Sequence, residues 1–384
     1  MFSRNLTAVS ASILMLCAGA AIASDLKVSG LVSTGVFYSK FDHQDADFII
    51  AKGQNTDQVS RLTISARESL GEDRFVQMTL ESALDPATGS IRQYPNSADR
   101  LFSRQSSLTV GNRTFELALG RIGTITSPNG PYSFYSRLGM NPTRSALGEL
   151  GVGGMTINHH IVDNAVVLNM KTPQNVIGTI LYSNGDVTAD DVDQEQTLDW
   201  SDRRHLMQGA LGWRSNKLRI GLIYTHEMPV INANNGMRKD AADMIHATAG
   251  WNFDGFGVSG TLFYAKNTTL AFGTPVAKMG VAPADLAVSN EGLETKSFYL
   301  GLSIPRGPHF LSLSGGYGKT TWKGETAASN LANDEGDLWT VAGVYRYSFS
   351  KRTNLYFAAA RVDGSDLTDA ASRHIVTTGI NHSF

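Results

Sequence analysis

Residues 60–82 read SRLTISARESLGEDRFVQMTLES, and this stretch decides the fold. Apolar and polar side chains alternate on both sides of the four-residue turn LGED (70–73). Successive side chains of a β-strand point to opposite faces of the sheet, so the alternation predicts a hairpin whose strands each have one apolar and one polar face. The apolar positions are Leu62, Ile64, Ala66, Val76, Met78 and Leu80.

The same alternation recurs along most of the remaining chain, in segments of roughly ten residues. Clear cases lie at 115–119, 218–224 and 298–304, where every second residue is apolar. Helical periodicity is nearly absent, which favours an all-β fold.

The connections between these segments alternate in length. Short turns fall at 70–73, 111–114, 172–175, 214–217, 253–256, 305–308 and 350–353, and long loops at 41–57, 86–99, 123–160, 185–203, 229–243, 269–294, 321–337 and 364–373. These seven turns and eight loops separate sixteen strands. Antiparallel strands with short turns at one end and long loops at the other are typical of an outer-membrane β-barrel. A bilayer offers no partner to an unpaired backbone group, so the first and last strands must pair.

A soluble β-sandwich or β-solenoid would also show alternation. A sandwich gives no reason for the alternating connection lengths, and no period of roughly 20 to 50 residues recurs as a solenoid requires. We therefore expect a sixteen-stranded antiparallel transmembrane β-barrel, with residues 24–384 as a single domain.

Residues 1–23 have the features of a secretory signal peptide, because Arg4 precedes an apolar run that ends in the small-residue site Ala21-x-Ala23. The only cysteine, Cys17, lies in that run, so the chain from Ser24 onward can form no disulfide. Without Arg4 the chain has 33 − 1 = 32 basic and 35 acidic residues, a net charge of −3. This balance argues against a nucleic-acid partner.

No motif for catalysis, a cofactor or a metal is convincing. The sequence HEMPV (226–230) has Val230 where a zinc-protease HExxH has its second His, and no G-x-S-x-G occurs. The acidic loop at 185–203 lacks the EF-hand spacing. We predict no enzymatic activity, no cofactor and no metal site.

Five stretches resemble the Gram-negative general porins of the neisserial and β-proteobacterial type. They are SRLTISARESLGEDRFVQMTLESALDPATG (60–89), LFSRQSSLTVGNRTFELALGR (101–121), FYLGLSIPRG (298–307), YRYSFSKRTNLYFAAARVDG (345–364) and the terminal GINHSF. The resemblance implies a homotrimeric channel for ions and small hydrophilic solutes, with the loop at 123–160 folded into the lumen. It also implies contact with outer-membrane lipid and lipopolysaccharide, and with the barrel-assembly machinery.

Charged residues on the polar face are the candidates for a pore constriction. Period 2 places Arg61, Arg67 and Glu81 there, and the resemblance assigns Arg61 and Arg104 to the family's basic wall. Arg121 also matches a family motif. However, strict alternation puts Arg121 on the same outward face as Phe115, Leu117 and Leu119. A local bend would be needed to turn Arg121 inward.

The loop at 123–160 departs from the family pattern of several carboxylates, because its only acidic residue is Glu149, beside Arg137 and Arg144. Asp163 stands where some relatives carry a further wall arginine. We therefore expect a weak preference for anions, moderated by Glu81, Glu149 and Asp163.

The chain ends on Phe384, which closes an outward row with Val376 and Ile380. Phe384 matches the C-terminal aromatic residue of the family. The resemblance implies that the barrel-assembly machinery recognises this residue.

Two alternatives to a general diffusion channel are a substrate-specific channel and an adhesin or enzyme barrel. A substrate-specific channel would be expected to show an aromatic ladder, and none is visible in the sequence. An adhesin or enzyme barrel would need a large exterior domain, for which no loop is long enough.

Overall fold

The computed structural model describes residues 25–42, 46–52, 57–91, 100–127, 130–140, 155–157, 161–184, 205–228, 240–268, 270–271, 274–275, 292–323 and 335–384. The expected signal peptide, the acidic loop at 185–203, Arg144 and Glu149 lie outside these residues.

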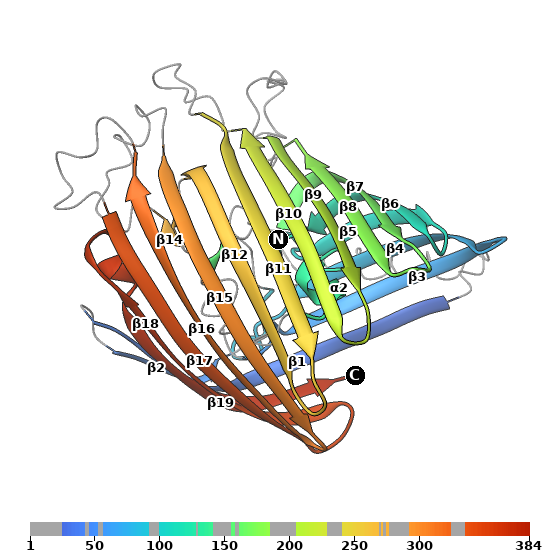
Figure 1. Ribbon diagram of the computed structural model, residues 1–384. Coiled ribbons are helices and arrows are strands. Elements are labelled where there is room, and N and C mark those ends of the chain that lie inside the picture. The colour runs from blue at the N-terminus through green and yellow to red at the C-terminus, as the bar shows by residue number, and fades with distance from the viewer. Residues whose placement is uncertain are drawn as a thin grey trace, which may run out of the picture.

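Sixteen antiparallel strands of the described chain form one closed barrel, as the sequence predicts (Figure 1). They are β1 (Asp25–Phe41), β3 (Arg61–Gly71), β4 (Arg74–Ala83), β5 (Gln105–Gly111), β6 (Phe115–Gly123), β7 (Ile161–Lys171), β8 (Val176–Ser183), β9 (His205–Arg214), β10 (Leu218–Met228), β11 (Ala242–Asn252), β12 (Gly257–Thr268), β15 (Leu293–Arg306), β16 (His309–Trp322), β17 (Glu335–Ser348), β18 (Thr353–Gly364) and β19 (Arg373–Ser383). Each strand pairs with the next, and β19 pairs with β1 from Leu31↔Ser383 to Phe41↔Arg373.

One predicted loop is partly wrong. Residues Ala46–Lys52, inside the loop predicted at 41–57, form the strand β2, which pairs with the long-loop half of β1. The physical reason is that β1 has 17 residues and β3 only 11, so β3 pairs only with Asp25–Leu31. The strand β2 supplies the partner for the remaining edge of β1.

Other long connections also contain short elements. The loop after β6 holds the helix α2 (Phe134–Leu138), and the loop after β12 holds the two-residue strands β13 (Leu270–Ala271) and β14 (Thr274–Pro275). The connection from β18 to β19 holds the 3-10 helix η5 (Asp366–Ala371). No described helix is long and apolar enough to cross a membrane.

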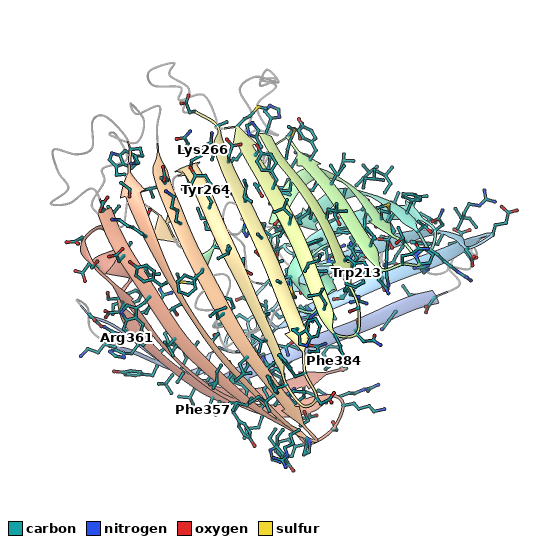
Figure 2. All side chains as sticks on the ribbon, in the orientation of Figure 1. Trp213, Tyr264, Lys266, Phe357, Arg361 and Phe384 are labelled. Atoms are coloured by element: carbon teal, nitrogen blue, oxygen red, sulfur yellow. The ribbon has the colours of Figure 1, made fainter. Side chains whose placement is uncertain are left out.

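The outer face of the barrel is apolar. Leu262 and Leu211 are 65% and 61% exposed, and the predicted rows on β6, β10 and β15 point outward as expected. Outward aromatic residues lie near the long-loop end at Tyr224, Tyr264, Tyr317 and Trp339, and near the short-turn end at Trp213, Trp251, Tyr345, Phe357 and Phe384. Figure 2 labels Tyr264 of the first row and Trp213, Phe357 and Phe384 of the second. Aromatic girdles of this kind mark the two edges of the hydrocarbon layer.

Phe384 continues the pairing of the last strand with the first. Its N–H donates to Gly30 O and its carbonyl accepts from Gly30 N, both at 3.1 Å. Its ring lies over Gly30, where an added Cβ would overlap it. Val376, Ile380 and Phe384 are 40%, 41% and 50% exposed, which confirms the predicted outward row.

The seam between β1 and β19 is held from the lumen side by one buried ion pair. Asp57, which is 0% exposed, lies in the connection from β2 to β3. Arg346 on β17 donates to both of its carboxylate oxygens, at 2.6 and 2.7 Å. Asn381 on β19 donates to the same carboxylate at 2.6 Å. The contact joins residues 289 positions apart in the chain.

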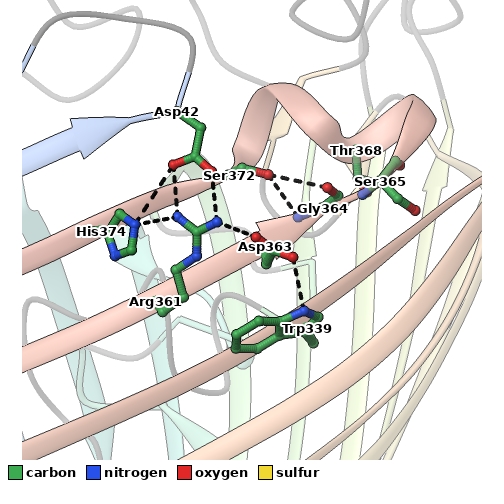
Figure 3. A network of polar contacts seen from close by, with 9 residues as sticks. All are labelled: Asp42, Trp339, Arg361, Asp363, Gly364, Ser365, Thr368, Ser372 and His374. Carbon is green, nitrogen blue, oxygen red and sulfur yellow. Dashed lines mark hydrogen bonds and ion pairs between the residues drawn. The ribbon is translucent and has the colours of Figure 1, made fainter.

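A second arginine holds the seam from outside, at the long-loop end. Arg361 on β18 donates to both oxygens of Asp42 at 2.7 Å, and also to Asp363 and to His374 Nε2 (Figure 3). Trp339 Nε1 donates to Asp363 at 3.1 Å. Asp42 directly follows β1, so this network ties the end of β1 to β17, β18 and β19.

The inner contact generates a stability prediction. Replacing Arg346 by Met leaves Asp57 buried without its bidentate partner, and we expect a cost of about 3–5 kcal/mol. The measurement is the temperature at which the folded band disappears on a detergent gel, which should fall in R346M. The double variant D57L/R346M should recover part of the loss, because no charge is then left buried. The control R306M removes an exposed arginine at the short-turn end of β15. An unchanged transition in R346M would contradict the role of this pair.

Candidate functional site

The charges on the inner wall are concentrated on one side of the barrel. Among the described residues, the inward positions of β11, β12, β15 and β16 carry no Asp, Glu, Lys or Arg. The inward positions of β3, β6, β9 and β10 carry five arginines, and the other inward arginines of the described strands are Arg346 on β17 and Arg373 on β19. The candidate site therefore lies on β3 to β7 and the segment before β5.

Glu81 on β4 joins two arginines. Arg104 Nε donates to Glu81 Oε1 at 2.6 Å, and Arg61 Nε lies 3.7 Å from Glu81 Oε2. Thr63 donates to the same carboxylate at 2.7 Å. Arg104 is 6% exposed, whereas the Arg61 side chain is 31% exposed. The structure thus brings together the predicted residues Arg61, Glu81 and Arg104.

Asp163 on β7 joins a second pair of arginines. Arg121 Nη1 and Arg100 Nη1 donate to its two oxygens, each at 2.5 Å. Arg121 Nε also donates to Ser103 O at 2.8 Å, next to Arg104. The two arginine–carboxylate groups are therefore neighbours on the wall.

A β-bulge turns Arg121 inward. The pairing of β6 with β7 shifts between Gly120 and Ile122, and Gly120 has φ +129°, a conformation that favours glycine. This is the bend that the sequence-based assignment of Arg121 required. The bulge gives Arg121 the parity of the lumen side, where it meets Asp163.

We call this group the arginine wall: Arg61, Arg100, Arg104, Arg121, Glu81 and Asp163. Four guanidinium groups and two carboxylates give it a formal charge of 4 − 2 = +2. Each carboxylate lies between two arginines, so it moderates their positive potential and fixes their positions. Fixed charges in a wall of low dielectric act on ions over distances of about 8 Å at physiological salt.

The loop between β6 and β7 contacts the opposite wall. Gln208 on β9 accepts from Ile125 N at 2.9 Å and donates to Thr126 Oγ1 at 3.1 Å. Phe134 and Leu138 of α2 cover Gly212 and Gly221, where an added Cβ would overlap the Phe134 ring. Tyr135 Oη is hydrogen-bonded to His246 Nδ1 on β11 at 2.6 Å.

Two arginines hold the carboxyl end of α2. Arg214 Nη1 on β9 donates to Arg137 O at 2.6 Å, and Arg219 Nη1 on β10 donates to Gly139 O. Cations at a helix C-terminus interact favourably with its free carbonyl groups. Arg214, Arg219, Gln208 and His246 are thus anchors for this loop on β9 to β11.

The side chain of Arg137 lies apart from the arginine wall. It donates to Asn169 Oδ1 on β7 and to Thr179 Oγ1 on β8, toward the short-turn end. Burial lowers the pKa of Arg137, while the nearby Glu116 carboxylate opposes this shift. Burial also raises the pKa of Tyr132 in the same loop.

The remaining sequence-based candidates are also spread out. Arg67 faces inward near the short-turn end of β3, with its guanidinium 3.6 Å from the centre of the Phe75 ring. Sequence analysis missed Arg100, which lies in a non-periodic segment, and the four loop anchors. Arg214 and Arg219 flank a short turn and have inward parity, which is the only signal that the sequence offers for them.

No group of three or more His, Cys, Asp or Glu residues in the described chain could hold a metal ion. The groups that the arginine wall presents are guanidinium groups and carboxylates held in ion pairs.

Comparisons with known proteins agree with this geometry. Residues 8–367 match the family described as Gram-negative porin. The chain is 25% identical to an outer membrane porin protein of Bordetella pertussis, over 98% of this chain and 99% of that protein. The fold is similar to that of an anion-selective porin from Comamonas acidovorans, with a TM-score of 0.65, 18% identity and coverage of 94% and 99% of the two chains. It is also similar to the trimer form of OmpT of Vibrio cholerae, with a TM-score of 0.58, 12% identity and coverage of 94% and 99%.

The closed barrel with an apolar outside and a charged inner wall, together with the family match, shows that the protein is an outer-membrane channel and that the chain belongs to the Gram-negative porin family.

Proposed function

We propose that the protein is a general diffusion channel for ions and small hydrophilic solutes, with a weak preference for anions. The observation that carries this proposal is the arginine wall, whose formal charge is +2 and whose two carboxylates are each shared by two arginines. The two carboxylates neutralise part of the positive charge of the four arginines, so we expect the preference for anions to be weak. The anion selectivity named for the Comamonas acidovorans porin supports the sign of the preference.

We also propose that the loop at 123–160 folds into the lumen and narrows it opposite the arginine wall. The support comes from its described part, since Ile125, Phe134 and Tyr135 contact inward positions of β9, β10 and β11. Arg137, Arg144 and Glu149 would then add charges along the passage, beside Arg67 near its short-turn end.

A homotrimer is the proposed assembly. The described outward positions of β3, β4 and β5 carry no aromatic side chain, so both aromatic rows are interrupted there. Aromatic girdles contact lipid, and their absence indicates a surface covered by protein. The trimer form of OmpT, a protein of the same fold, supports a trimer.

Selectivity is the test of the proposed function. Arg104→Gln should move the zero-current potential in a KCl gradient toward cations, because it leaves Glu81 with less compensation. Glu81→Gln should move it toward anions, because it removes a carboxylate from between two arginines. We expect each permeability ratio to change about two- to tenfold, since 1.4 kcal/mol corresponds to a factor of ten. The control Arg113→Gln removes an exposed charge in the β5–β6 turn.

Conductance should stay within the same order of magnitude in all three variants. If the zero-current potential is the same in R104Q, E81Q and R113Q, then the arginine wall does not line the narrow part of the pore.

The loop anchors make a second prediction. In the double variant R214M/R219M, the carboxyl end of α2 loses two donors, so we expect a noisier and larger single-channel current. The matched variant R214K/R219K keeps both charges and one donor group at each position, and it should restore most of the quiet current. A current in R214M/R219M that is as quiet as that of the unmodified protein would contradict the anchoring role of these arginines.

We propose that Phe384 serves recognition by the barrel-assembly machinery. Deleting Phe384 should lower the amount of trimer in the outer membrane several-fold, because β19 loses its last backbone pairs with Gly30. Secretion into the periplasm should be unaffected. The control Phe349→Ala removes another exposed aromatic ring at the short-turn end. Undiminished trimer after the deletion, measured on gels of outer-membrane fractions, would contradict this role.

A further inference from the structure

Two arginines lie side by side on the inner wall at the short-turn end of the barrel. Arg214 is the last residue of β9, Arg219 is the second residue of β10, and the strand register places them directly opposite one another. Both have inward parity and both are half-buried. Directly opposite residues on one face have Cβ atoms about 4.5–5.5 Å apart, and like charges in this arrangement are destabilising. The fold therefore holds two positive charges together at this position.

Arg137 of α2 brings a third guanidinium group to the same end of the lumen. Its carbonyl accepts from Arg214, and its side chain donates to residues of β7 and β8. Burial lowers the pKa of Arg137, Glu116 and Tyr132 oppose this shift, and repulsion by Arg214 adds to it. The charges of Arg137 and Arg214 therefore act on one another. We call Arg137, Arg214 and Arg219 the exit arginines.

The exit arginines differ from the arginine wall in the charge of their partners. Within the described part of the chain, all their hydrogen-bond acceptors are uncharged: Arg137 O, Gly139 O, Asn252 Oδ1, Asn169 Oδ1 and Thr179 Oγ1. The carboxylate of Glu116 lies near Arg137 and accepts from Asn169 Nδ2 at 3.1 Å, but it forms no ion pair with an exit arginine in that part of the chain. The positive charge of this group is thus not held in ion pairs.

Many donor groups of the opposed pair also remain available. A guanidinium group has five N–H donors. Among the described residues, Arg214 donates through Nη1 to one acceptor, and Arg219 donates through Nη1 and Nη2 to one acceptor each. The enclosed Arg219 Nε has no acceptor there. Gly139, which accepts from Arg219, is exposed, so this contact lies at the surface of the lumen.

The exit arginines and the arginine wall lie at different depths of the channel. Arg61 is the first residue of β3 and Asp163 the third of β7, so the wall lies in the long-loop half of the barrel. Arg214 and Arg219 flank a short turn, and the short turns of an outer-membrane barrel face the periplasm. An anion that enters from outside therefore meets the wall first and the exit arginines afterwards.

We propose that Arg214 and Arg219, with Arg137 beside them, form a binding site for doubly charged tetrahedral oxyanions, the class of sulfate and phosphate, at the periplasmic mouth of the channel. One such anion between the two opposed guanidinium groups balances their charge and accepts hydrogen bonds from both, a pairing for which arginine is well suited. A singly charged anion balances only half of that charge. The site goes beyond the proposed selectivity of the arginine wall, because none of its groups belongs to that wall.

The test measures block of the chloride current by sulfate in single trimers of the full-length protein in planar bilayers. Sulfate should reduce the current of the unmodified channel, whereas nitrate at the same ionic strength should leave it nearly unchanged. In R214Q/R219Q, we expect the sulfate concentration that halves the current to rise about ten- to hundredfold, the order that a hydrogen bond to a charged group contributes. In R214K/R219K, which keeps both charges, it should rise less than about fivefold.

Two controls separate the site from its surroundings. Tyr135→Phe removes the hydrogen bond of α2 to His246 but keeps all three exit arginines. Arg306→Gln removes an exposed arginine at the same end of the barrel, at an outward position of β15. Each should change the half-blocking sulfate concentration less than about twofold, since neither alters a group that contacts the anion. Inorganic phosphate at about pH 8, where its second proton is largely lost, should rank the variants as sulfate does.

Several results would overturn the proposal. They are an equal block of R214Q/R219Q and the unmodified channel, a loss in Y135F or R306Q as large as in R214Q/R219Q, a block by nitrate as strong as that by sulfate, and a different ranking with phosphate. The variant R104Q tests the arginine wall separately, because it should shift the zero-current potential in KCl and leave the block by sulfate in place. Loss of the block in R104Q would place the anion at the wall and would also overturn the proposal.

Discussion

The requirement that every backbone N–H and C=O group finds a partner within the bilayer governs this structure. A sheet can satisfy it only by closing, and so β19 must return to β1. The closing seam joins the two ends of the chain, and ion pairs lie beside it on both faces. Arg346 holds Asp57 on the lumen side, and Arg361 holds Asp42 on the outside. The same requirement explains β2, which pairs with the part of β1 that β3 does not reach.

Closure also divides each strand into an outward and an inward row, and the composition of the arginine wall depends on where this division is interrupted. Strict alternation along β6 would place Arg121 in the lipid, at a cost of about 2–4 kcal/mol near the bilayer midplane. The bulge after Gly120 instead places it in the lumen beside Asp163. A single glycine with positive φ thereby adds a guanidinium group to the arginine wall and joins the groups centred on Glu81 and Asp163.

The sequence was sufficient for the strands, the short turns and the inward or outward parity, because these depend on a local period of two. The period of two placed Arg61 and Glu81 on the inner face, the family resemblance added Arg104, and the contacts of these three residues agree with that. The sequence could not predict the partners of Asp57 or Arg100, which lie in segments without periodicity, or the contact of Tyr135 with His246, 111 residues away. Such contacts are set by which strands the closed barrel brings together. The sequence did not predict β2. This strand forms because β3 is too short to pair with the whole of β1.

The distribution of the two basic side chains follows from the same division. Arginine occupies the positions where geometry must be fixed: between the carboxylates of the wall, across the seam, and at the carboxyl end of α2. Its planar guanidinium group binds carboxylates and carbonyls in defined directions. Lysine occupies the exposed outer rim of β12, β15 and β16, where a compact ammonium group can exchange partners. A channel needs stationary charges toward its solutes, whereas the surface toward the lipid must accommodate molecules that move. Among the described strands, arginine thus predominates in the inner wall and in the contacts of the seam, and lysine on the outer rim of β12, β15 and β16.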